Sequence, residues 1–95
     1  MATRGVPPAG HEAVPFVTET ERRVGEIWSN VLRVEPIDRT SHFFELGGQS
    51  LLAIRMIARI RRDFGTKVAV STVFNAPTVE CFSALLDTIQ HSPST

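Results

Sequence analysis

Residues 43–53 read FFELGGQSLLA, and this stretch decides how the rest of the chain is interpreted. Gly47-Gly48 interrupts an apolar loop, and Ser50 then opens a helical pattern that continues without a break to residue 64. Gly65 follows, at the position where glycine commonly ends a helix. The stretch therefore predicts a helix over 50–64 whose first hydroxyl stands behind two residues without side chains.

The predicted helix over 50–64 carries apolar residues on two sides. The wider side has the spacing of a core-facing helix and consists of Ala53, Met56, Ile57, Ile60 and Phe64. The narrower side begins beside Ser50 and consists of Leu51, Ile54 and Ala58. One bundle contact cannot bury both sides. The narrower stripe is therefore either the margin of the core or ordinary surface, or a docking patch for a partner.

A second helix is predicted on the N-terminal side of this stretch. Thr18 and Glu21 have the spacing of a capping box, in which each side chain accepts a hydrogen bond from the other residue's backbone N–H. Pro36 prevents this helix from running further. Its apolar residues recur at i, i+3, i+4, i+7 and i+8, at Val24, Ile27, Trp28, Val31 and Leu32.

The loop between these two helices, residues 35–49, has no helical period but is too apolar to be freely solvated. We expect it to pack on the core through Ile37, Phe43, Phe44 and Leu46.

Two more helices are predicted after Gly65, a short one over 72–75 and a longer one over 79–89. Ser71 and Thr78 are the expected caps, and Pro77 separates the two helices. The longer helix has a predicted buried stripe of Val79, Phe82, Leu86 and Ile89. Four helices and no convincing strand predict an all-α fold, a small four-helix bundle.

The termini differ in composition from the predicted bundle. Residues 1–17 are rich in proline and glycine, which is typical of a linker. Residues 18–91 form the predicted domain, and residues 92–95 a flexible tail.

The composition limits the possible functions. A chain of 95 residues can enclose one small core but hardly a catalytic cleft, so a non-catalytic role is expected. Ten basic and ten acidic residues cancel, which argues against nucleic acid or membrane as a partner. No apolar run resembles a membrane span or a signal peptide, so we expect a cytoplasmic protein. We also expect the isolated domain to be monomeric.

The single cysteine, Cys81, excludes an internal disulfide. With only three histidines as further soft ligands, no zinc spacing can be drawn, and no metal site is predicted. Cys81 adjoins the predicted buried stripe and is expected to be a small packing residue.

Ser50 can be interpreted in three ways from the local pattern. A helix N-terminus offers unpaired backbone N–H groups and a positive dipole end, so Ser50 is well placed to carry a phosphate ester. It can equally be a simple N-cap. A nucleophile elbow would need glycine at position 52, where Leu52 stands, and would need a histidine base that the sequence does not obviously supply.

The arginines of the same helix raise a separate alternative. Arg55, Arg59, Arg61 and Arg62 make it basic, as in the recognition helix of a helix-turn-helix protein. The preceding glycine pair and the zero net charge argue against that interpretation. A solvated face, with contact of Arg55 to a phosphate or to a coenzyme, is the other interpretation.

The motifs together resemble the peptidyl carrier, or thiolation, family of nonribosomal peptide synthetases. The resemblance covers about residues 18–90 and rests on residues 18–21, 27–28, 31–32, 43–53 and 74–79, in that order. It implies the four-helix carrier fold. It also implies a covalent 4′-phosphopantetheine on Ser50, donated by coenzyme A, with Gly48, Gln49 and Leu51 beside it.

The resemblance further implies a function and partners. A phosphopantetheinyl transferase would modify Ser50, and the arm would then carry aminoacyl or peptidyl thioesters. Adenylation, condensation, tailoring and thioesterase domains would be visited in turn. Their expected docking residues are Leu51, Ile54, Arg55 and Ala58.

One residue departs from the pattern of the family, because Gln49 stands where histidine is most common before the serine. This change puts any inference about the neighbouring domain in doubt, but not the attachment itself. The alternative within the same chemistry is an acyl carrier of polyketide or fatty acid synthesis. The neutral charge and the Gly-Gly-Gln-Ser context favour the peptidyl branch.

Overall fold

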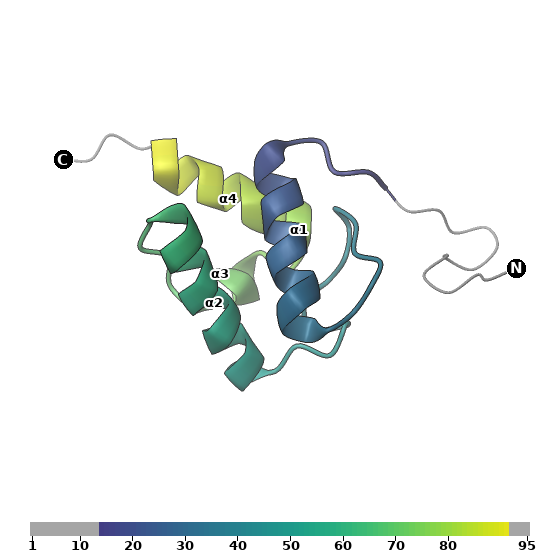
Figure 1. Ribbon diagram of the computed structural model, residues 1–95. Helices are drawn as coiled ribbons and strands as arrows, with labels where there is room; N and C mark the ends of the chain where they lie inside the picture. Colours follow the sequence, from purple (N-terminus) through teal and green to yellow (C-terminus); the bar gives the residue numbers. More distant parts are fainter. Residues whose placement is uncertain (1–13, 92–95) are drawn as a thin grey trace, which may run out of the picture.

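The computed structural model describes residues 14–91, apart from the side chain of His91. Four helices are present in this range, namely α1 (Glu19–Leu32), α2 (Ser50–Phe64), α3 (Ser71–Asn75) and α4 (Val79–His91). Within the described range, the one β-type pairing is an isolated antiparallel bridge between His42 and Thr78. The predicted all-α fold of four helices is confirmed (Figure 1).

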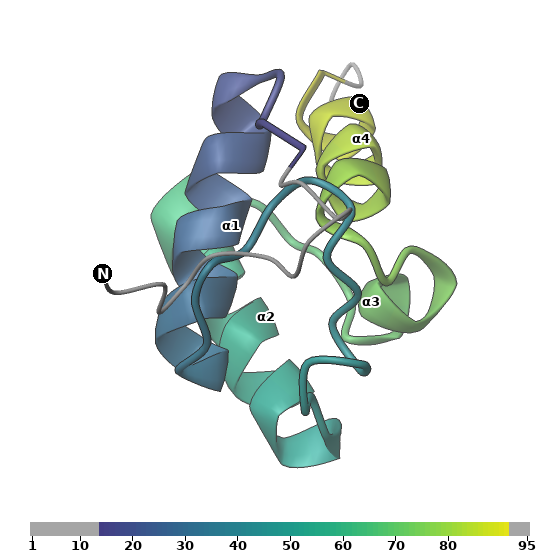
Figure 2. The ribbon, with the colours of Figure 1, turned by 90° about the vertical axis from the view of Figure 1, so that its right-hand side faces the viewer.

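The three longer helices enclose the core. Helix α1 packs against both α2 and α4, and α3 is a short link between α2 and α4 (Figures 1 and 2). The loop of residues 33–49 runs from the end of α1 to the start of α2. The N-terminal end of α2 points down in Figure 1, away from the C-terminal end of α4.

An aromatic cluster lies in the middle of the core. The Trp28 ring is fully buried, with its centroid 5.1 Å from that of Phe43 and 5.8 Å from that of Phe82. These rings come from α1, the loop and α4, so one cluster joins three parts of the chain. The other buried apolar residues are Val24, Ile27, Ala53, Met56, Ile57, Ile60, Val68, Val73, Ala76, Val79 and Leu86.

Helix α1 begins with half of the predicted capping box. The Thr18 hydroxyl accepts a hydrogen bond from the Glu21 N–H at 3.0 Å. The Glu21 carboxylate reaches one residue further than predicted and accepts from the Val17 N–H at 2.8 Å. The helix ends before Pro36, because Arg33 adopts a left-handed backbone conformation with φ 58°.

Helix α2 and the loop before it follow the sequence-based predictions. The helix ends at Gly65, which has φ 63°. The wide apolar side is buried, and Phe64 packs partly buried against the core. In the loop, Phe43 is fully buried, and Ile37 and Phe44 are partly buried against the core. Leu46, also predicted to pack there, is half-buried and is not among the residues packed on the core.

Two predictions for the last two helices were wrong. Ser71 does not cap α3, because the helix begins at Ser71 itself with Val70 at the cap position. Ile89 is exposed rather than buried, since the buried stripe of α4 consists of Val79, Phe82, Ser83 and Leu86, all in its first eight residues. Thr78 does cap α4, as its hydroxyl accepts from the Cys81 N–H at 3.3 Å.

Cys81 is also exposed, so its prediction as a packing residue was wrong. Successive residues of a helix are separated by about 100° around its axis. Cys81 is therefore turned well away from Phe82, which is fully buried.

The chain just before α1 contacts the helical unit. The Val14 N–H donates to Asp38 at 2.9 Å, and Phe16 packs on α1 so closely that a Cβ at Gly25 would overlap its ring. The predicted boundary at residue 18 is the start of the capping box, and Val14 and Phe16 before it also contact the fold. Most of the predicted linker, residues 1–13, and the predicted tail, residues 92–95, lie outside the described residues.

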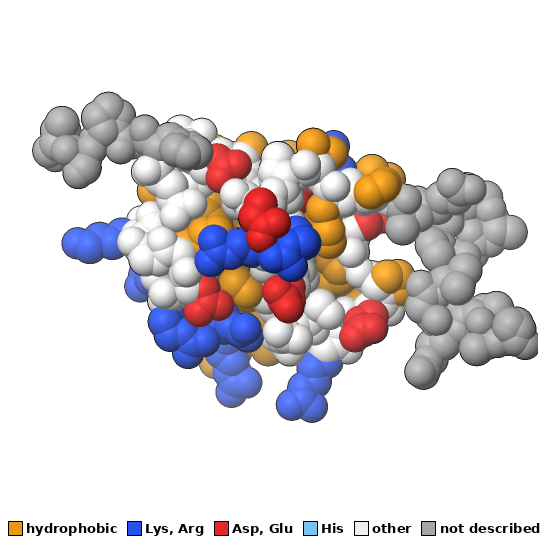
Figure 3. Space-filling model, turned by 45° about the horizontal axis from the view of Figure 1, so that its top comes forward, with side chains coloured by type: hydrophobic (Ala, Val, Ile, Leu, Met, Phe, Trp, Pro, Cys, Tyr) orange, Lys and Arg blue, Asp and Glu red, His pale blue; other side chains and the backbone are white. Residues whose placement is uncertain are grey.

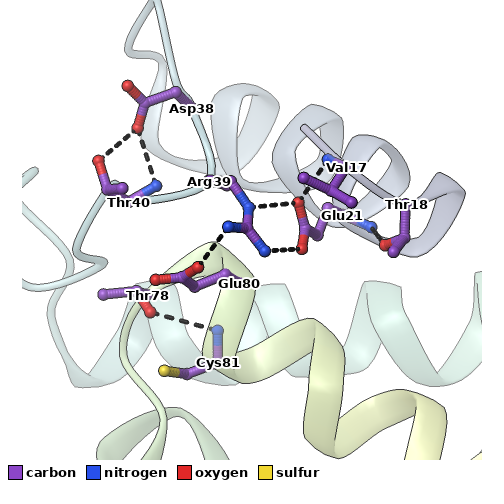
Figure 4. A network of polar contacts seen from close by, with 9 residues as sticks. All are labelled: Val17, Thr18, Glu21, Asp38, Arg39, Thr40, Thr78, Glu80 and Cys81. Atoms are coloured by element: carbon purple, nitrogen blue, oxygen red, sulfur yellow. Dashed lines mark hydrogen bonds and ion pairs between the residues drawn. The ribbon is translucent and has the colours of Figure 1, made fainter. Parts of the chain in front are cut away.

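A charged network joins α1, the loop and α4 on one side of the core (Figure 4). Arg39 from the loop binds the Glu21 carboxylate through two hydrogen bonds, of 3.0 and 2.8 Å. A third guanidinium nitrogen lies 2.9 Å from the Glu80 carboxylate at the start of α4. The Glu21 side chain is only 5% exposed, so this pair is shielded from water. The surface pair Arg22–Glu19 has side chains that are 55% and 67% exposed.

The network makes a prediction about acid stability. The pKa of the Glu21 carboxyl is lowered, mainly by hydrogen bonds from Arg39 and against the opposing effect of burial. A lowered carboxyl pKa stabilises the fold above the unfolded-state pKa, and this contribution is lost as the pH falls through the folded-state pKa. We expect Glu21→Gln to lower the stability at pH 7 by about 1 to 3 kcal/mol.

The difference in melting temperature between the wild type and Glu21→Gln should then narrow as the pH falls below the ordinary glutamate pKa of 4.5. Circular dichroism melts between pH 7 and pH 2 measure this difference. Glu19→Gln is the control, because its partner Arg22 is exposed, and it should melt like the wild type at pH 7. A difference that is constant over the whole pH range would contradict the prediction.

Candidate functional site

Ser50 is the first residue of α2, and its side chain is exposed. Gln49 holds the N-cap position in an extended conformation (φ −132°, ψ 172°) and makes no side-chain cap hydrogen bond. The interpretation of Ser50 as the N-cap of this helix is therefore wrong. Within residues 14–91, no hydrogen bond occupies its hydroxyl, which is left available for chemistry.

The turn before Ser50 depends on two different glycines. Gly47 has φ 102°, a conformation that side chains disfavour, although no atom lies near its missing Cβ. Gly48 has no such φ, but a Cβ there would overlap the ring of Phe43 and lie 2.6 Å from its carbonyl oxygen. The Gly48 N–H donates to the same Phe43 oxygen at 3.0 Å. Phe43 in the loop thus holds the backbone closely at Gly48, two residues before Ser50.

The start of α2 lacks the negative groups found at the starts of α1 and α4. Its first turn contains no acidic residue, whereas α1 has Glu19 and Glu21 there and α4 has Glu80. No side chain among the described residues caps its first turn. The free N–H groups and the dipole of the helix therefore favour an anion at this end, by about 0.3 to 1 kcal/mol when exposed.

These features fit a phosphate ester on Ser50. The hydroxyl is exposed, the two preceding glycines have no side chains, and the helix end attracts negative charge. The same residues offer no catalytic base. The described His42 side chain is engaged elsewhere, since its Nδ1 accepts a hydrogen bond from the Glu45 N–H at 3.3 Å. The nucleophile-elbow alternative therefore gains no support from the described residues.

The narrow apolar stripe of α2 lies on the surface. Leu51 is 59% exposed and Ile54 is 53% exposed, and both Ala58 and Arg55 are exposed as well. Ile57, on the other side of the helix, is only 1% exposed. The predicted docking residues thus share a solvent-facing side that begins beside Ser50. The interpretation of the stripe as core margin was wrong, whereas exposure agrees with both ordinary surface and a docking patch.

An exposed aromatic residue was missed in the sequence. Phe74 in α3 is 55% exposed, and its ring stacks on that of Phe44 with centroids 4.9 Å apart and an interplanar angle of 19°. A helix of only five residues has too few positions to show a hydrophobic period. No local pattern in the sequence therefore shows that Phe74 is exposed while Val73 is buried.

Three of the four arginines of α2 are paired within the domain. Arg59 and Arg62 both contact the carboxylate of Asp63, with N–O distances of 3.1 and 3.2 Å. Arg61 donates to the Val68 carbonyl at 2.8 Å. On the face shown in Figure 3, acidic and basic side chains stand side by side with apolar ones between them. In α2 itself, two of the four arginines share one acidic partner, which differs from the one-signed surface of a nucleic-acid recognition helix.

Comparison with known proteins adds independent observations. Residues 22–86 match the protein family described as "Phosphopantetheine attachment site". Tyrocidine synthase 2 of Brevibacillus parabrevis is 35% identical over 83 residues, which are 87% of this chain and 2% of that protein. Malpinin synthetase of Mortierella alpina is 42% identical over 66 residues, which are 70% of this chain and 1% of that protein. The chain therefore spans a very small part of these relatives.

Solved structures share the fold. A peptidyl carrier protein, studied as an active-site mutant, superposes with a TM-score of 0.80 at 26% identity, covering 93% of this chain and 98% of that one. A peptidyl carrier protein in complex with the phosphopantetheine transferase Sfp and coenzyme A has a TM-score of 0.74 at 28% identity, covering 80% of this chain and 97% of that one.

Of the helices that the structure describes, none is long and apolar enough to cross a membrane.

The two sides of α2 can be separated by substitution. Ile57→Glu would place a carboxylate in the core, and we expect a loss of about 3 to 5 kcal/mol, enough to unfold a small domain. Ile54→Glu keeps its charge in water and should change the stability by about 0.5 kcal/mol. Urea denaturation followed by circular dichroism measures both. A large loss of stability in Ile54→Glu would contradict the assignment of this side to the surface.

Proposed function

This chain belongs to the phosphopantetheine attachment-site family and is a peptidyl carrier domain of the nonribosomal peptide synthetase type, and from this premise we propose that Ser50 carries its 4′-phosphopantetheine arm. The observation that carries the proposal is the exposed Ser50 hydroxyl at the start of α2, where neither a side-chain cap nor an acidic residue occupies the helix end. The proposed carrier unit spans residues 18–91.

The attachment step follows from the groups present. The Ser50 oxygen forms a bond to the phosphorus of coenzyme A that bears the pantetheine. The P–O bond to the second phosphate of the pyrophosphate breaks, and 3′,5′-adenosine bisphosphate leaves. The serine proton passes to a base on the transferase, because no described side chain of this domain is placed to accept it. The N–H groups of the first turn of α2 would then stabilise the negative charge of the phosphodiester.

The domain itself acts as a carrier and not as a catalyst in this proposal. When attached, the arm supplies a terminal thiol that holds an aminoacyl or peptidyl group as a thioester. The glycines before Ser50 leave access to the arm, and a tether raises the concentration of its cargo at each neighbouring site.

The proposed partners are a phosphopantetheinyl transferase and the adenylation, condensation, tailoring and thioesterase domains of a cytoplasmic synthetase. Their proposed docking surface consists of Leu51, Ile54, Arg55 and Ala58, beside Ser50 on the exposed side of α2. Gly48, Gln49 and Leu51 are the proposed neighbours of the arm. Nucleic acid and membranes are not proposed as partners.

The attachment is tested by incubating the chain with coenzyme A and a broad-specificity phosphopantetheinyl transferase. We expect one phosphopantetheine adduct per chain by intact mass, on the peptide that contains Ser50. A chain that stays unmodified while a control carrier is modified would refute the proposal.

Ser50→Ala separates the chemistry from the fold. Since Ser50 is exposed and makes no cap hydrogen bond, its hydroxyl adds little to the stability. We expect a change in stability of about 0.5 kcal/mol and complete loss of modification. Circular dichroism melts and intact mass measure the two effects. An adduct on the variant would place the attachment at another residue.

The docking surface is tested with Ile54→Glu, whose fold should persist. A charge in the centre of a transient apolar interface should raise the KM of the transferase for the carrier by about tenfold or more. Thr88→Glu is the control, as an exposed position on α4. Equal KM values for the wild type and Ile54→Glu would remove this side of α2 from the interface.

A further inference from the structure

We propose that Phe43 is a positioning residue for the modification of Ser50, acting through Gly48 and the Pro77 carbonyl, and we call these three residues the Phe43 clamp. This inference rests on the proposed function of Ser50. Phe43 lies seven positions before Ser50 and is fully buried, so it would act through the backbone and not by touching the arm.

The first part of the clamp is the hold on Phe43 itself. Its N–H donates to the Pro77 carbonyl at 2.7 Å, just before α4, and its ring packs edge-on against Trp28. The neighbouring loop residues are paired with the same segment, since the Val79 N–H donates to the Ser41 carbonyl at 3.2 Å. Phe43 is thus fixed in position by α1 and by the α3–α4 junction.

The second part is the hold of Phe43 on Gly48. The Phe43 carbonyl accepts the Gly48 N–H at 3.0 Å, and the ring fills the space where a Cβ would be. Phe43 therefore holds Gly48 both by the close approach of its ring and by a hydrogen bond. Only Gln49 separates it from Ser50.

The third part is the weak hold on the residues next to Ser50. Gln49 makes no cap hydrogen bond, and Leu51, in the first turn, is 59% exposed. Leu52 is partly buried against the core, and Ala53, whose N–H donates to the Gln49 carbonyl at 2.7 Å, is the first residue of α2 that is fully buried. Ser50 is therefore positioned from Gly48 on one side and from Leu52 and Ala53 on the other.

Gly47 and Gly48 therefore have different structural roles. Gly47 supplies a backbone conformation, with open space at its missing Cβ. Gly48 supplies the close approach to Phe43. A methyl group at Gly48 should push the backbone away from the ring and displace the Ser50 hydroxyl, while the exposed side of α2 stays intact. Misplacement of a reacting atom by about 1 Å can reduce the rate about 100-fold.

The test measures kcat and KM of the transferase reaction for Gly48→Ala, well below the melting temperature of each variant. We expect kcat to fall by about 100-fold with little change in the KM for the carrier. The double variant Phe43→Leu/Gly48→Ala relieves the overlap with the ring but not the close approach to the Phe43 carbonyl oxygen, so it should recover only part of the lost kcat. Normal kcat in a folded Gly48→Ala variant would overturn the proposal.

If Gly48→Ala does not fold, a second pair of variants tests the positioning role of Phe43. Phe43→Leu loosens the hold on Gly48, whereas Val24→Ala removes a fully buried side chain of α1. Both variants are assayed at the same number of degrees below their own melting temperatures. Under these conditions, only Phe43→Leu should lower kcat. Equal kcat values in the two variants would show that Phe43 contributes stability alone. Failure of the wild type to be modified would refute the proposed function instead, because the clamp variants are judged against a modified wild type.

Discussion

The burial of Phe43 against Trp28 is the interaction on which the rest of the structure depends. Full burial of a phenylalanine contributes about 1.5 to 3 kcal/mol, and an edge-on aromatic pair about 0.5 to 1.5 kcal/mol more. A small domain has a total stability of about 5 to 15 kcal/mol. The loop of residues 33–49 therefore supplies a substantial part of the stability although it has no regular structure. Its packing on the core also fixes the course of the loop up to Ser50.

The charged network at the other side of the loop complements this apolar contact. Arg39 connects α1 to the start of α4 through two carboxylates, one of them almost fully buried. Its pairing with Glu21 spans 18 residues of sequence, so it favours the native closure of the loop over local alternatives. The exposed Arg22–Glu19 pair adds little to this, because exposed pairs contribute about 0 to 1 kcal/mol. The loop is thus held by an aromatic contact at one point and by an ion pair at another.

The sequence predicted the features that depend on periodicity and missed those that depend on contacts between distant residues. The spacing of apolar residues located α2 and its buried side, and Gly65 marked its end. Thr18 and Glu21 marked the start of α1, but no local pattern could show that Glu21 also binds Arg39. The exposure of Cys81 and Phe74 depends on which side of a helix meets the core, and in the short α3 that information is absent from the sequence. The position of Ser50 was predictable, whereas the packing of Gly48 on Phe43 needed coordinates.

The location of Trp28 has a consequence for the optical properties of the domain. The chain contains one tryptophan and no tyrosine, so its intrinsic fluorescence on excitation near the indole band comes from one fully buried ring. That ring touches Phe43 from the loop and Phe82 from α4. Its emission therefore reports the closure of the loop onto the core, without any attached dye. The domain thus contains a built-in spectroscopic reporter of the loop that leads to Ser50.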